Sequence, residues 1–270
     1  MDPVWARVLK TWGLKRQRIG ERMATKQRWK KAQEYEQGFW ERAAQRAAEG
    51  SYDQLDFYEW RAGEIQKRLA SLGQGQEMLF DGSRRFVELG SGPIGVLGFL
   101  PAQERAAVDP LNHFYGSNDH LTELRNADVR YIEASGEAVP LESGRYDLVI
   151  MENCIDHVKD PAAVMAEIWR LLVPEGFLYL TVNGRSRPGY YVHRLLARLA
   201  LDPGHPHTFT EGRFQHMLKV HGFDILDYDA GSWASAWRDD LISSGLKRKA
   251  KGLLCVSEHL LSAVARKVER

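Results

Sequence analysis

A glycine-rich segment and the acidic residues around it are the part of this chain best suited to binding a ligand. Residues 90–95 read GSGPIG and directly follow a short apolar run, FVEL, at residues 86–89. Glycines at such a strand end let the backbone approach a ligand closely, and a following helix would offer free N–H groups. Asp109 ends the next apolar run, where a carboxylate can accept hydrogen bonds from both hydroxyls of a ribose. The pattern indicates a nucleoside-like ligand, although a glycine turn can also serve the fold alone.

Two residues discriminate among nucleoside-like ligands. Glu88 lies two residues before Gly90, and its carboxylate would repel a pyrophosphate but suits a ligand that carries an amino group. Pro93 has no N–H at a position where a dinucleotide-binding helix needs one. Both residues argue against an NAD-dependent oxidoreductase and favour a cationic amino-acid–nucleoside ligand without phosphate.

Strands and helices alternate around this loop. Apolar runs predict six strands, at residues 86–89, 106–110, 129–134, 146–153, 177–183 and 224–231. Helices are predicted to begin after the loop at residues 94–100, after Asp160 and after a Thr210 N-cap. Such alternation is typical of a doubly wound parallel sheet in an α/β protein.

The two ends of the chain lack this alternation of strands and helices and are predicted to be helical. Residues 3–72 predict three helices, the first with Trp5, Val8, Leu9 and Trp12 at helical spacing. Residues 246–268 alternate basic and apolar residues and predict an amphipathic helix, which either packs on the domain or lies on a membrane surface. We therefore expect an N-terminal helical extension (1–80), a ligand-binding domain (81–236) with an acceptor-side insertion (183–213), and a basic C-terminal tail (237–270).

Residues 85–231 resemble the class I S-adenosylmethionine-dependent methyltransferases. The family pattern E-x-G-x-G is matched by Glu88, Gly90 and Gly92, the ribose acid by Asp109, and the run from the third to the fifth strand by residues 136–182. The resemblance implies a mostly parallel, seven-stranded Rossmann-like sheet and S-adenosylmethionine as cofactor. The residues expected to hold the cofactor are Glu88, Gly90, Ser91, Gly92, Asp109, Pro110, Ser135, Gly136, Glu137, Glu152 and Asn153.

Residues after the fourth strand and in the insertion are candidates for the methyl acceptor. His157 follows that strand and is either a general base or a histidine packed at a helix entrance. His207 is a second catalytic candidate. A polar acceptor such as a sugar hydroxyl, or merely a solvated loop, explains the cluster of Tyr190, Tyr191, His193 and His205. No acidic cluster at metal-ligand spacing accompanies His205 and His207 in the sequence, so no metal is expected.

Composition limits the remaining possibilities. The net charge of +1 over 270 residues gives no general preference for nucleic acid, although residues 1–31 hold ten Lys and Arg against two acids. The two cysteines, Cys154 and Cys255, have no metal-ligand spacing and suit the cytoplasm. We expect O-methylation of a small molecule or glycan. The alternatives are an RNA or protein methyltransferase that uses the basic N-terminus, which could also touch a membrane, and a non-catalytic cofactor-binding scaffold.

Overall fold

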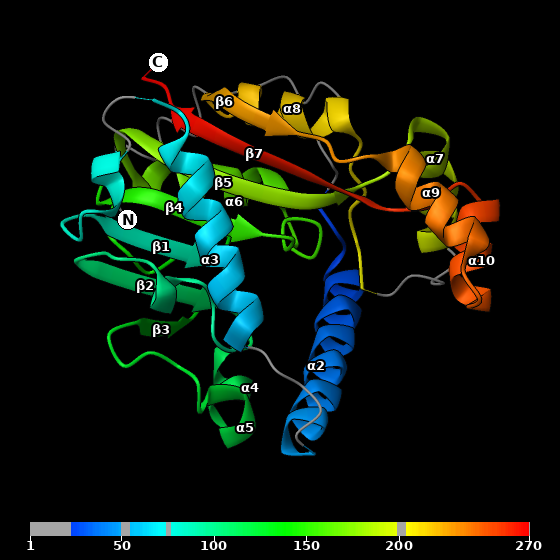
Figure 1. Cartoon of the computed structure of the whole chain (residues 1–270), viewed down its shortest axis with the longest axis horizontal. Helices are drawn as coiled ribbons and strands as arrows, with labels where there is room; N and C mark the ends of the chain where they lie inside the picture. The colour runs from blue at the N-terminus through cyan, green and yellow to red at the C-terminus, as the bar shows by residue number, and fades with distance from the viewer. Residues whose placement is uncertain (1–22, 50–54, 74–76, 199–203, 270) are drawn as a thin grey trace.

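The molecule is built around one seven-stranded sheet with the strand order β3-β2-β1-β4-β5-β7-β6 (Figure 1). The computed structural model describes residues 23–49, 55–73, 77–198 and 204–269, so the first predicted helix, with Trp5 and Trp12, lies outside them. The strands are β1 (Arg85–Leu89), β2 (Glu104–Asp109), β3 (Arg130–Glu133), β4 (Tyr146–Glu152), β5 (Leu172–Gly184), β6 (Phe223–Asp229) and β7 (His259–Lys267).

Strands β1 to β5 run parallel, and β7 is antiparallel to both of its neighbours. The six strands predicted from apolar runs are all present, and the doubly wound α/β fold is confirmed. The predicted single helix over residues 246–268 is wrong in its second half. The chain turns at Cys255, where φ is +55°, and β7 then enters the sheet between β5 and β6. Leu261, Ala263 and Ala265 of β7 pack in the core on one face of the sheet, whereas Val264 packs in the core on the other face, which is strand periodicity.

Helices cover both faces of the sheet. They are α2 (Lys26–Ala48), α3 (Leu55–Ala70), α4 (Asn112–Gly116), α5 (Asp119–Thr122), α6 (Pro161–Leu171), α7 (Arg187–Arg198), α8 (Glu211–Val220), α9 (Trp233–Ile242) and α10 (Leu246–Leu253), with short 3₁₀ turns η1 (Glu77–Phe80) and η2 (Leu97–Phe99). The predicted helix start after Asp160 is confirmed, and the Asp160 side chain caps α6 by accepting from the N–H groups of Ala162 and Ala163. None of the helices described in the structure is both long and apolar enough to cross a membrane.

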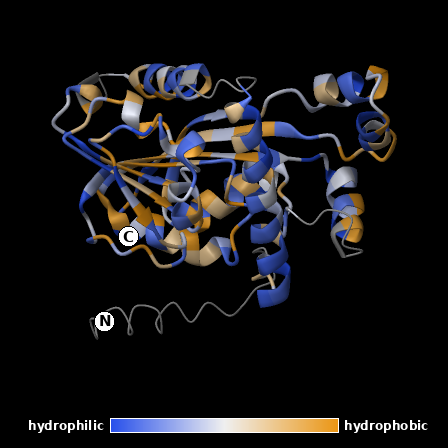
Figure 2. Ribbon diagram, turned by 90° about the horizontal axis from the view of Figure 1, so that it is seen from below, coloured by the Kyte–Doolittle hydropathy of each residue, from blue (hydrophilic) through white to orange (hydrophobic). Residues whose placement is uncertain are grey.

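Two hydrophobic cores lie on the two faces of the sheet. On one face, Ile65 and Leu69 of α3 pack against strand residues such as Phe86 and Ile150. On the other, Ile168 of α6 packs against residues including Val149 and Val87. In Figure 2 the central strands are mostly orange and the outer helices are largely blue. The sheet is therefore fixed by burial on both faces, as expected for parallel strands.

The helix predicted at residues 94–100 does not form. Pro93 and Pro101 bracket this segment, and Gly95 has a φ of +76°, so only the 3₁₀ turn η2 appears between β1 and β2. Helix α3, from the chain before the sheet, packs on η2 and covers the same face. The glycine loop is thus held by α3 and not by a crossover helix of its own.

Candidate functional site

A cavity of about 520 Å³ lies at the edge of the sheet where β1 and β4 end. The connections from these two neighbouring strands run to opposite sides, toward β2 and β5, so this is the switch point where ligands of doubly wound sheets bind. The structure brings all eleven predicted cofactor residues to this cavity: Glu88, Gly90, Ser91, Gly92, Asp109, Pro110, Ser135, Gly136, Glu137, Glu152 and Asn153.

The glycine turn needs its glycines. Gly90 has a φ of +74°, and a Cβ built on it would lie 2.4 Å from Cys154 Sγ. Gly92 has a φ of +62°, and its Cβ would lie 3.3 Å from the ring of Trp40. The Cys154 thiol in turn donates to the carbonyl oxygen of Leu89 at 3.2 Å, and burial raises its pKa. The backbone therefore passes close to the cavity with no room for side chains.

Asp109 lies at the end of β2 with its carboxylate buried at the cavity wall. Its Oδ2 accepts from the Gly92 N–H at 3.0 Å, and its Oδ1 accepts from the Leu111 N–H at 2.8 Å. Burial raises its pKa to about 6 despite these hydrogen bonds. Each carboxylate oxygen has a second lone pair, so Asp109 can also receive ribose hydroxyls.

Glu88 lies beneath the turn that follows β1. Its Oε2 accepts from the Val96 N–H at 2.9 Å, and only 3% of the residue is exposed. Burial raises its pKa to about 8. The Glu88 carboxyl group thus holds the segment at Val96, where the predicted helix does not form. Glu88 also lines the cavity.

The ends of β3 and β4 close the cavity on two sides. Glu137 accepts from the N–H groups of Lys159 and Asp160, which fastens the segment after β3 to the start of α6. Asn153 follows β4 with a φ of +50°, and its Oδ1 accepts from the Asn183 N–H at 3.1 Å. These hydrogen bonds fix the two segments that line the cavity after β3 and β4.

Helices α2 and α3 supply the outer wall. One stripe of α2 lines the cavity with Trp29, Gln33, Glu36 and Trp40, which recur at helical spacing. Phe39 of α2 and Phe57 and Tyr58 of α3 add further aromatic side chains to this wall. Glu36 and Gln33 were not predicted to line a site, because two polar residues on an aromatic helix stripe resemble an ordinary solvated face.

His157 lies at the end of the cavity that adjoins α2. Its Nδ1 is 3.9 Å from Glu36 Oε2, and its Nε2 is 3.7 Å from Asp156 Oδ1. The His205 ring lies against it, with ring centroids 4.7 Å apart. Of the two histidines predicted to act in catalysis, His157 is the one that lines the cavity.

The other acceptor candidates lie outside the cavity. His207 is buried with its Nε2 2.8 Å from the carbonyl oxygen of Val158, and the His193 Nδ1 is 2.7 Å from Thr208 Oγ1. Tyr190 is buried in α7 against Arg213, whose guanidinium lies 5.0 Å from the ring centroid. Tyr191, on the same helix, is 72% exposed. None of these four residues is among the described residues that line the cavity.

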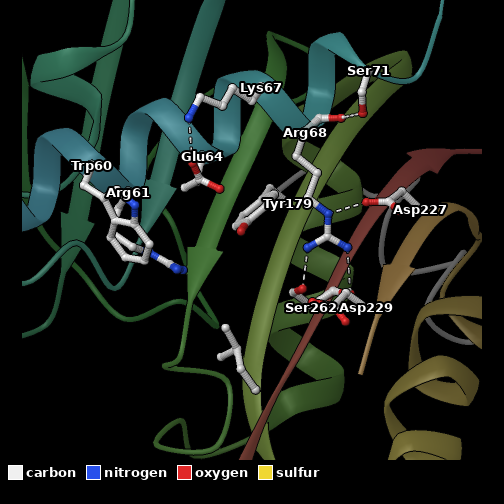
Figure 3. A pocket seen from close by; sticks show the side chains of 11 residues that line it. Trp60, Arg61, Glu64, Lys67, Arg68, Ser71, Tyr179, Asp227, Asp229 and Ser262 are labelled. Carbon is white, nitrogen blue, oxygen red and sulfur yellow. Dashed lines mark hydrogen bonds and ion pairs between the residues drawn. The ribbon is translucent and has the colours of Figure 1, made fainter. Parts of the chain in front are cut away.

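A second hollow, of about 430 Å³, lies between α3 and the strands β5 to β7 (Figure 3). Several of its charged side chains are paired: Arg68 forms an ion pair with Asp227 and hydrogen bonds with Ser262, and Lys67 lies 2.9 Å from Glu64. The contacts of Arg68 hold α3 on the sheet, whereas the Lys67–Glu64 pair lies within α3.

Comparison with known proteins agrees with this geometry. Residues 87–180 match the family described as "Methyltransferase domain". The chain is 28% identical over 149 residues to an uncharacterized methyltransferase of Mycobacterium sp. (strain JLS), covering 52% of this chain and 56% of that one. It is 30% identical over 112 residues to a ubiquinone biosynthesis O-methyltransferase of Paracidovorax citrulli, covering 40% of this chain and 47% of that one. It thus spans about half the length of these relatives.

Among solved structures, the chain is similar to Haemonchus contortus phosphoethanolamine N-methyltransferase 2 in complex with S-adenosyl-L-methionine. The TM-score is 0.56 at 18% identity, covering 77% of this chain and 52% of that one. The sheet, the cavity and the matched domain define a class I methyltransferase. Residues 87–180 thus belong to a methyltransferase domain, and the chain shares the fold of a solved methyltransferase that holds S-adenosyl-L-methionine.

Proposed function

We propose that the protein transfers the methyl group of S-adenosylmethionine to a hydroxyl oxygen of a small molecule or saccharide held under α2 and α3. The observation that carries this proposal is the meeting of eleven predicted cofactor residues in one cavity whose far end holds a histidine. The match to an O-methyltransferase of ubiquinone biosynthesis supports oxygen as the acceptor atom.

The cofactor half of the cavity is formed by the strand ends. Asp109 would receive the ribose hydroxyls, and the turn at Gly90 would face the methionine part of the cofactor. Ser135 and Gly136, at the end of β3, would face the adenine. The ion pair between Arg61 and Glu152 borders the same space and fixes α3 over the cofactor.

The acceptor half of the cavity is formed by α2, α3 and the loop after β4. Trp29, Phe39 and Phe57 give it apolar surface, and Glu36 and Gln33 supply hydrogen-bonding groups. Such a mixture of flat apolar and polar groups suits a ring that bears hydroxyls.

In methyl transfer, an acceptor oxygen attacks the sulfonium methyl in line with the departing sulfur. The O–CH₃ bond forms as the S–CH₃ bond breaks, S-adenosylhomocysteine leaves, and the acceptor hydroxyl loses its proton. Because the cofactor supplies the activated methyl, the protein mainly aligns the reactants and excludes water. His157 lines this cavity, and we assign to it the role of receiving the proton.

Product analysis tests the proposed acceptor class. Purified protein is incubated with S-adenosylmethionine and separate panels of hydroxylated aromatics, saccharides, RNA and protein. We expect S-adenosylhomocysteine to accumulate with a hydroxylated small molecule, which becomes heavier by one methylene with its new methyl on oxygen. Turnover only with RNA or protein, or a methyl found on nitrogen, would contradict the proposal.

A further inference from the structure

Three metal-ligating side chains converge beside the acceptor end of the cavity. Asp156, His157 and His205 each offer one ligand atom, and the three atoms lie within 4.8 Å of one another. Asp156 and His157 follow β4, whereas His205 lies on the loop before α8. The fold therefore unites residues that are almost fifty positions apart in the sequence.

The Asp156 side chain points to a positively charged ligand. Only 1% of the residue is exposed, and neither carboxylate oxygen accepts a hydrogen bond from any residue that the structure describes. A buried carboxylate without a hydrogen-bond donor is strongly destabilising, so it requires a cation or a proton. The imidazole of His157 lies beside it, with Nε2 3.7 Å from Asp156 Oδ1.

The rings of His157 and His205 lie 4.7 Å apart, so both imidazoles stand close to this carboxylate. A metal ion would use one oxygen and two nitrogens together. Glu36, 3.9 Å from His157 Nδ1, stands where an outer carboxylate stands behind many metal-bound histidines.

We propose that Asp156, His157 and His205 form a binding site for a divalent transition-metal ion such as Zn²⁺. Two imidazoles and one carboxylate are a ligand set that suits zinc and similar ions and leaves a further coordination position open. The sequence did not predict a metal, because Asp156 is distant from His205 in the chain and follows β4.

Metal binding goes beyond the proposed function and is testable without it. Its link to catalysis does rest on that function. An ion at this place would lower the pKa of an acceptor hydroxyl bound to it, and His157 would then be a ligand and not the base.

Zinc titration of the full chain tests the site. The protein is treated with EDTA, dialysed and titrated with Zn²⁺ in a calorimeter, and cobalt(II) is added separately to record its visible absorption. We expect one ion per chain and a rise in the midpoint of thermal unfolding. His205→Gln and Asp156→Asn should each weaken zinc binding at least about 100-fold, because each removes a direct ligand.

His113→Gln is the matched control, because His113 is an exposed histidine on α4, away from the cluster. It should bind zinc as the wild type does. If Asp156→Asn fails to fold, His205→Gln carries the comparison, since His205 lies on a partly exposed loop. The proposal is overturned if the wild type binds no stoichiometric zinc or cobalt, or if folded His205→Gln and His157→Gln bind zinc as tightly as His113→Gln.

Discussion

Arg61 of α3 forms an ion pair with Glu152 at the carboxyl end of β4, and both side chains are about 15% exposed. A helix from the chain before the sheet is thus fastened to a strand at the switch point. Removal of Arg61 would leave a poorly solvated carboxylate at the cavity wall, which is destabilising.

We predict that Arg61→Ala weakens binding of S-adenosylmethionine about 10-fold, because both Glu152 and α3 lose their orientation. Isothermal calorimetry measures the dissociation constant. Arg68→Ala is the matched control: Arg68 lies on the same helix and is paired with Asp227 in the second hollow (Figure 3). It should lower thermal stability without changing cofactor affinity. Equal effects of the two variants on affinity would contradict this role of Arg61.

The glycine turn gives a second prediction. Gly90→Ala places a Cβ 2.4 Å from Cys154 Sγ at a φ of +74°. Steric overlap and backbone strain together should lower the free energy of unfolding by about 2–5 kcal/mol, as measured by urea denaturation. Gly116→Ala is the control, because a Cβ there meets nothing within 4 Å among the described residues. Similar losses in the two variants would show that Gly90 is not sterically required.

Two buried carboxyls set a pH dependence. The pKa of Glu88 is raised to about 8 and that of Asp109 to about 6, both chiefly by burial. Unfolded carboxyls titrate near about 4, so between about pH 4.5 and 8 the folded chain keeps protons that the unfolded chain loses. The stability from neutral Glu88 is complete below about pH 4.5 and is lost as pH rises through about 8.

We therefore predict that the free energy of unfolding of the ligand-free protein falls from about pH 5 to 8. Glu88→Gln should flatten this fall, since its amide oxygen can still accept from the Val96 N–H. Urea denaturation at several pH values measures both proteins. An unchanged slope in Glu88→Gln would contradict the assignment of the pH dependence to this residue.

Trp40 lines the cavity, whereas Trp60 lines the neighbouring second hollow, so the two tryptophans can be compared as variants. The Trp40 ring lies against Gly92, and its Nε1–H donates to Glu36 Oε1 at 3.1 Å. We predict that Trp40→Ala weakens S-adenosylhomocysteine binding about 10-fold by exposing the turn to water. Trp60→Ala should leave affinity unchanged, because Trp60 is 56% exposed and borders the second hollow. Calorimetry measures the dissociation constant of S-adenosylhomocysteine for both variants. A larger loss of affinity in Trp60→Ala than in Trp40→Ala would contradict the assignment of Trp40 to the cavity wall.

Local sequence determined much of the sheet but not all of it. β4 was predictable because a nearly continuous apolar run is typical of a buried parallel strand. β7 was not, since its basic residues and small apolar residues fit a helix until β5 and β6 are placed on either side. The short η2 turn shows the same effect, because α3 covers the face that a crossover helix would have covered.

The residues of the proposed cofactor half of the cavity were more predictable than those of the proposed acceptor half, for a physical reason. Glu88, Gly90 and Gly92 lie within five residues, and Asp109 ends the strand that pairs with β1, so their proximity follows from local structure. Arg61 and Glu36 reach the cavity only through the packing of α2 and α3. His205 meets Asp156 only because the chain returns to the sheet edge before α8, which no local pattern encodes.

The most direct test of the account is calorimetric titration of the purified chain with S-adenosylmethionine, beside Asp109→Ala and the exposed-residue control Asp119→Ala. We predict saturable binding of one cofactor per chain by the wild type and by Asp119→Ala. Asp109→Ala should bind at least about 10-fold more weakly, because the ribose loses its buried acceptor. Absence of binding by the folded wild type, or full affinity in Asp109→Ala, would contradict the assignment of this cavity to the cofactor.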